Sequence, residues 1–146
     1  MLYTYRKTGE TLILQGKKFG TIVTGNGTAE IALTGNSILL EEGNEFRIAI
    51  SRCTPNGAFV ACLVANQSES RELMEFMARK DGQEYSASGI TILVESVDAA
   101  KGTATVRIIT DKPIVLKSNG ELRVMLERIE RAGNESHAII GIMEEW

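Results

Sequence analysis

Short stretches in which apolar or β-branched residues alternate with polar ones recur along most of the chain. Gly, Asn and Pro separate them, and Asn-Gly pairs stand at 26–27, 56–57 and 119–120. A period of two predicts strands, and Asn-Gly between apolar segments predicts hairpin turns. We therefore expect a mainly β fold. The predicted strands are Thr11–Gln15, Gly20–Thr24, Thr28–Thr34, Ile38–Glu41, Phe46–Arg52, Ala58–Ala65, Ile90–Val97, Thr103–Thr110, Ile114–Lys117 and Ala138–Met143.

One segment, Ser68 to Lys80, departs from this alternation. Leu73, Phe76 and Met77 would share one helical face, Glu75 and Arg79 have the spacing of an i,i+4 ion pair, and Gly82 follows as a stop signal. The pattern predicts one helix near 68–80, which makes the expected fold class a β-rich α+β fold.

The chain also resembles itself across this predicted helix. Residues 27–34 align with 102–109, and residues 38–52 align with 114–128. In the second pair, the charged residues Glu45, Arg47 and Arg52 recur as Glu121, Arg123 and Arg128. We expect an internal duplication with a first β-module at 1–66, a connecting helix at 67–82 and a second β-module at 83–146. Two modules of this size would share one core, as a pseudo-symmetric barrel or sandwich.

The segment 121–131 has signals for both secondary structures. Leu122, Met125, Leu126 and Ile129 fit a helix, and Ser118 and Glu121 have the spacing of a capping box. Its counterpart in the first copy alternates as a strand does. The sequence therefore leaves helix and strand open for 121–131.

Composition indicates one ordinary globular unit. The 146 residues are 43% hydrophobic and 24% charged, and the formal net charge of −3 argues against a globally basic nucleic-acid binder. If Cys53 faces Ala58 across a hairpin, Cys62 lies opposite Ala49 and the two thiols are too far apart to bridge. The N-terminal residues lack the apolar run of a signal peptide, and no stretch is long enough to span a membrane. We expect a cytoplasmic protein.

Candidate catalytic chemistry is sparse. His137 is the only histidine, so a histidine-based metal cluster or a serine triad of the usual kind is excluded within one chain. No phosphate-binding loop is present, because the glycines at 25 and 27 lack the required spacing. We expect a non-enzymatic protein with no cofactor and no metal, and a hydrolase that uses carboxylates alone stays open as a weaker alternative.

The N-terminus carries the motif Met1-Leu-x-x-x-Arg6-Lys7-x-Gly9-Glu10-Thr11-Leu12. This motif resembles the opening of the carbon storage regulator family, small dimeric β-proteins that bind messenger RNA leaders and control translation. The resemblance covers residues 1–50 and, more faintly, 90–130. It implies RNA contacts by Thr4, Arg6 and Lys7 and by the end of the fifth strand, where the first copy has Glu41 and the second has Lys117.

These observations lead to two main functional hypotheses. The first is an RNA-binding translational regulator that uses Thr4, Arg6, Lys7 and Lys117, since cations on neighbouring strands can contact phosphates. The second is a module that binds a protein or a small molecule, or self-assembles, through exposed apolar strands such as Phe59–Val64. Both are compatible with a homo-oligomer.

Overall fold

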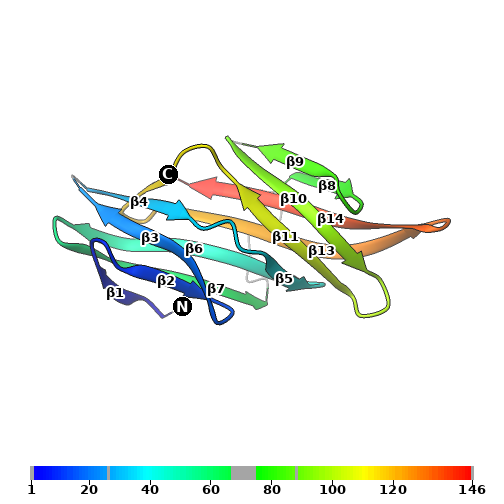
Figure 1. Ribbon diagram of the computed structural model, residues 1–146, viewed down its shortest axis with the longest axis horizontal. Coiled ribbons are helices and arrows are strands. Elements are labelled where there is room, and N and C mark those ends of the chain that lie inside the picture. The colour runs from blue at the N-terminus through cyan, green and yellow to red at the C-terminus, as the bar shows by residue number, and fades with distance from the viewer. Residues whose placement is uncertain (1, 26, 67–74, 88, 146) are drawn as a thin grey trace.

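A computed structural model describes residues 2–25, 27–66, 75–87 and 89–145, and within them every regular element is a β-strand (Figure 1). The mainly β prediction is confirmed. The strands are β1 (Thr4–Lys7), β2 (Thr11–Leu14), β3 (Lys17–Thr24), β4 (Thr28–Leu33), β5 (Ile38–Glu41), β6 (Asn44–Thr54), β7 (Gly57–Asn66), β8 (Glu75–Arg79), β9 (Glu84–Ala87), β10 (Ile90–Asp98), β11 (Thr103–Ile109), β12 (Ile114–Lys117), β13 (Glu121–Ala132) and β14 (Glu135–Glu145). None of the described residues belongs to a helix capable of spanning a bilayer.

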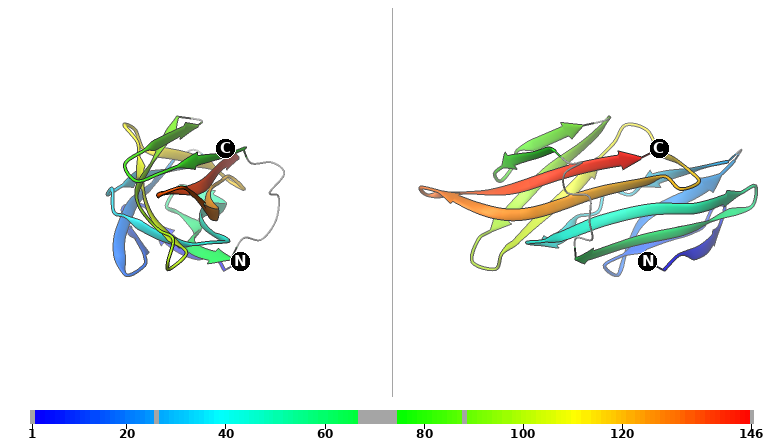
Figure 2. Two further views of the ribbon diagram at one scale, coloured as in Figure 1. Left: turned by 90° about the vertical axis from the view of Figure 1, so that its right-hand side faces the viewer. Right: turned by 180° about the vertical axis from the view of Figure 1, so that it is seen from behind.

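The strands form three antiparallel sheets in two layers. One layer is a six-stranded sheet in the order β1-β7-β6-β13-β14-β8, and the other consists of two four-stranded sheets, β5-β11-β10-β9 and β12-β4-β3-β2. Figure 1 shows the two smaller sheets in front, and Figure 2 shows the long strands of the large sheet from behind. The arrangement is a sandwich and not a closed barrel.

The strand order is two-fold symmetric. Exchanging each strand with the one seven places later maps the large sheet onto itself and the two small sheets onto each other. At the centre, β6 pairs with β13 so that Arg47 lies opposite Arg123. Each of these strands has an irregularity at the same relative place, Ser51 in β6 and Glu127 in β13. An internal duplication stays a prediction, and this is the strand order that a duplication would produce.

The two halves of the chain are interlocked. β5 from the first half pairs with β11, and β12 from the second half pairs with β4. Inward-facing residues of all three sheets, including Phe46, Ile92 and Leu116, belong to one hydrophobic core. Because one edge strand of each small sheet comes from the other half, neither half completes its sheets alone.

The predicted helix near 68–80 is wrong where the structure describes it, and its first part, 67–74, lies outside the described residues. Glu75–Arg79 is strand β8, which pairs with β14. Phe76 and Met77 therefore point to opposite faces of the sheet and do not share one face. Pairing with a neighbouring strand outweighs the weak helical pattern of this short segment.

The open question at 121–131 is resolved as strand β13. The six residues Glu121–Leu126 are all buried, because β13 is central and both of its faces are covered. Burial on both faces hides the alternation that marks a strand. This is why Leu122, Met125 and Leu126 look helical in the sequence.

The cysteines are unpaired and only partly buried. Cys53 lies opposite Ala58 as predicted, but Cys62 lies opposite Ile48, and not Ala49. The reason is the bulge at Ser51, which shifts the register of the hairpin by one residue.

The expectation of an exposed apolar strand at Phe59–Val64 is also wrong. These residues belong to β7, which pairs with β6 over its whole length and with β1 over Gly57–Val60. Val60 and Ala61 are buried, and the remaining four side chains are partly covered.

Candidate functional site

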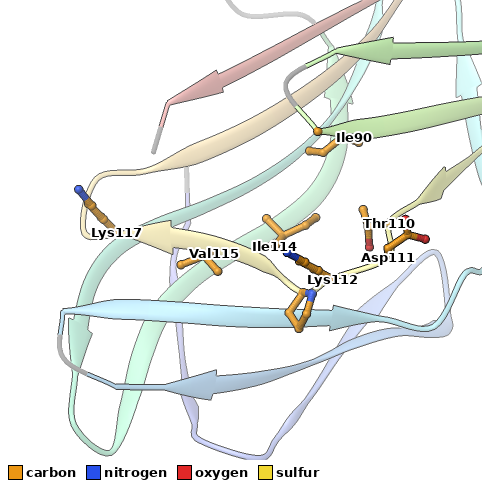
Figure 3. A pocket seen from close by; sticks show the side chains of 9 residues that line it. Ile90, Thr110, Asp111, Lys112, Ile114, Val115 and Lys117 are labelled. Atoms are coloured by element: carbon orange, nitrogen blue, oxygen red, sulfur yellow. The ribbon is translucent and has the colours of Figure 1, made fainter.

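An open pocket of about 540 Å³ lies beside β12 (Figure 3). β11 ends in one four-stranded sheet and β12 begins in the other, so residues 110–113 cross between the two sheets. The pocket forms at this crossing, against the start of β10. Its lining residues are Gly89, Ile90, Thr110, Asp111, Lys112, Pro113, Ile114, Val115 and Lys117.

The lining combines an apolar base with a charged rim. Ile90 and Ile114 are buried in the core, whereas Val115 is 42% exposed. Asp111, Lys112 and Lys117 are exposed. In Figure 3, Lys112 and Ile114 stand near the start of β12, and Lys117 points away from the other labelled side chains. The pocket is within the size range of small-ligand sites. Its two lysines outnumber its one carboxylate, Asp111, and this balance favours a ligand with an apolar part and a negative charge.

The lining has few of the residue types that commonly carry out catalysis. It contains neither histidine nor cysteine, and its carboxylate is Asp111. In the part of the chain that the structure describes, no group of three or more potential metal ligands is found. Thr110 therefore has no histidine in this lining to act as its general base.

No protein-family model, curated protein or solved structure matches this chain.

The structure divides the four residues predicted to bind RNA among three places. Thr4 and Arg6 line a separate pocket of about 190 Å³ between β1, β2 and β7. Lys7 points to the opposite face of β1, because adjacent residues of a strand alternate. Lys117 lines the pocket beside β12, in a different sheet. The strands that carry these cations are not hydrogen-bonded neighbours.

A carboxylate also stands next to the predicted RNA site on β1. The backbone N–H of Lys7 donates to Oε1 of Glu10 at 2.6 Å. A phosphate placed at this turn would meet that negative charge, which disfavours binding.

Sequence reasoning found Lys117 but missed the rest of the pocket. The sequence feature that marks the rest of the pocket is the polar run Thr110-Asp111-Lys112 followed by Pro113, which lies between two predicted strands. Such a run predicts a connection but does not show that its ends lie in different sheets. The crossing that opens the pocket depends on the exchange of β5 and β12 between the halves.

The two thiols give a prediction that tests the packing around β6 and β7. Burial raises the pKa of Cys62 to about 12, and burial also raises the pKa of Cys53. We expect Cys62 to resist a thiol reagent such as dithionitrobenzoate at pH 8 in the folded protein and to react in urea, because the thiolate is the nucleophile. The Cys53→Ala variant isolates this signal, and rapid reaction of the folded variant would contradict the packing.

The same shift sets a pH window for stability. The folded pKa of Cys62 lies above the ordinary value of 9.0, so the contribution of the thiol is present below pH 9 and is lost as pH rises towards 12. We expect the urea midpoint to fall more between pH 8 and 10.5 in the wild type than in Cys62→Ala.

Proposed function

We propose that this protein is a non-enzymatic binding module whose ligand occupies the pocket beside β12. The observation that supports the proposal most directly is an open pocket with the buried Ile90 and Ile114 at its base and the exposed Lys112 and Lys117 at its rim. An apolar base supplies affinity and the rim charges select an anionic ligand. The unpaired cysteines agree with a reducing compartment such as the cytoplasm.

RNA binding through Thr4, Arg6, Lys7 and Lys117 stays an untested prediction. The geometry favours it less, because Arg6 and Lys7 point to opposite faces of β1 and Lys117 lies in another sheet. Phosphate binding needs several cations on one surface. Self-association is likewise an untested prediction.

A direct test of the pocket uses the fluorescent probe anilinonaphthalene sulfonate, which is both apolar and anionic. We expect the wild type to bind one equivalent, and Val115→Trp to weaken binding at least tenfold by filling the pocket. Lys112→Ala should weaken binding by a smaller, salt-dependent factor, because it removes one rim charge. Calorimetric titration measures the dissociation constant of the probe for the wild type and for each variant.

The symmetric strand order supplies a matched control. Leu39 holds the place in β5 that Val115 holds in β12, and it is 51% exposed. We expect Leu39→Trp to bind the probe as the wild type does. Equal binding by the wild type and Val115→Trp would show that the pocket is not the site.

A further inference from the structure

The two small sheets end on edge strands, β5 and β12, that occupy equivalent places. In β5, a side chain covers the edge that faces away from β11. The side-chain amide of Gln15 donates to the carbonyl of Leu39 at 2.8 Å, and its Oε1 accepts from the N–H of Leu39 at 3.0 Å. Gln15 therefore supplies to β5 the donor and acceptor that a neighbouring strand would supply.

Gln15 reaches this place from the turn between β2 and β3, where it adopts a left-handed backbone with φ of 51°. A left-handed conformation is unfavourable for a residue other than Gly, Asn or Asp. The corresponding turn between β9 and β10 has Ser88 and Gly89. Ser88 lies outside the described residues, and a serine has no carboxamide. The sequence of the second half thus lacks the group that covers the edge in the first half.

The edge of β12 opens into the pocket instead. β12 pairs with β4 on one side, and Val115 lies opposite Glu30. Alternate residues of a strand direct both backbone polar groups to the same side. Val115 has the position of Leu39, so its N–H and carbonyl point away from β4 and into the pocket that Val115 lines. In the described part of the chain, no side chain bonds to these two groups.

We propose that the free edge of β12 binds an extended, acidic peptide segment of a partner protein as an added strand of the sheet β12-β4-β3-β2. This proposal rests on the proposed function and names its ligand class. The backbone groups of Val115 provide the pairing, and Ile90 and Ile114 provide an apolar contact. Lys117 ends β12 and Lys112 lies two residues before its start, and both attract acidic side chains.

Lysines on an edge strand also protect sheets against unwanted pairing, so charge alone does not decide the matter. The experiment therefore measures the backbone amide groups and not the side-chain charges. Amide hydrogen exchange of the full chain is measured by NMR, with and without the blocked peptide Ac-Thr-Glu-Val-Glu-Thr-NH2. In the free protein we expect fast exchange at Val115 and slow exchange at Leu39. The peptide should slow exchange at Val115 at least tenfold and leave Leu39 unchanged.

Two controls make the test specific. Adjacent residues of a bound strand direct their N–H groups to opposite sides. Two peptides are compared, one N-methylated at the central Val and the other at the following Glu. We expect one of these two peptides, but not the other, to bind at least tenfold more weakly than the unmethylated peptide. Gln15→Gly keeps a residue that accepts the left-handed backbone and uncovers β5. It should accelerate exchange at Leu39 at least tenfold and leave Val115 unchanged.

The outcomes separate this inference from the proposed function. Slow exchange at Val115 in the free protein, or probe binding in the pocket without any peptide effect at Val115, overturns the added strand and leaves a small-ligand pocket. Equal binding by both N-methylated peptides also overturns it. Failure of both the fluorescent probe and the peptide overturns the proposed function as well.

Discussion

Replacement of Arg123 by alanine is expected to lower the free energy of unfolding by about 3–5 kcal/mol. Arg123 in β13 contacts Glu45 in β6 through its Nη2 at 2.6 Å and its Nε at 2.7 Å. Their side chains are 2% and 3% exposed. Loss of the guanidinium removes from a buried carboxylate the cation that offsets its desolvation. Urea denaturation measures the change.

The symmetric counterpart provides the matched control for this prediction. Arg47 pairs with Glu121 at the equivalent place, but these side chains are 23% and 12% exposed. Water solvates the second pair more, so we expect Arg47→Ala to cost about 1–2 kcal/mol. Equal losses for the two variants would contradict the argument from burial. A double variant, Glu45→Leu with Arg123→Met, should recover much of the loss, because it removes both charges.

Replacement of Phe46 by alanine is expected to cost a similar amount, about 3–5 kcal/mol. Phe46 is fully buried in β6 and lies against Phe19 of the other layer, with ring centroids 5.1 Å apart. Its removal leaves a cavity between the two layers of the sandwich. The surrounding strands relax only partly, so the lost contacts are not recovered.

Two other variants identify the source of this loss. Phe46→Leu should cost about 1 kcal/mol, since leucine fills much of the space, as Leu122 does at the equivalent place in β13. Phe59→Ala removes a ring that also lies 5.1 Å from another, that of Tyr5, but on the outer face. Phe59 is only partly buried, so its loss should be smaller. If the urea midpoints show equal losses of stability for Phe59→Ala and Phe46→Ala, the assignment of Phe46 to the central core is refuted.

The alignment of the two halves identified equivalent charged residues that form ion pairs in the folded protein. Glu45 and Arg47 recur as Glu121 and Arg123, and these four residues form the two ion pairs across the centre of the large sheet. The alignment placed them at equivalent positions. It did not show that each arginine would pair with the glutamate of the other copy, which follows from the antiparallel register of β6 and β13.

Among the functional predictions, Lys117 is the residue that the structure places in the candidate site. Its predicted companions Thr4, Arg6 and Lys7 lie elsewhere, because β1 joins the large sheet beside β7. The resemblance that named them covers local motifs. Local motifs carry no information about which strand becomes the neighbour of another.

The alternation of residues and the turn signals by themselves determined that the chain is mainly β and where most strands lie. These properties depend on neighbouring residues along the chain, and so they can be seen in the sequence. Only the tertiary structure decided that 75–79 and 121–132 are strands, that β5 and β12 are exchanged, and that one edge is covered while the other opens into a pocket. Those outcomes depend on pairing between strands far apart in sequence, which outweighs weak local preferences. Such pairing produces no repeating pattern of residues along the chain.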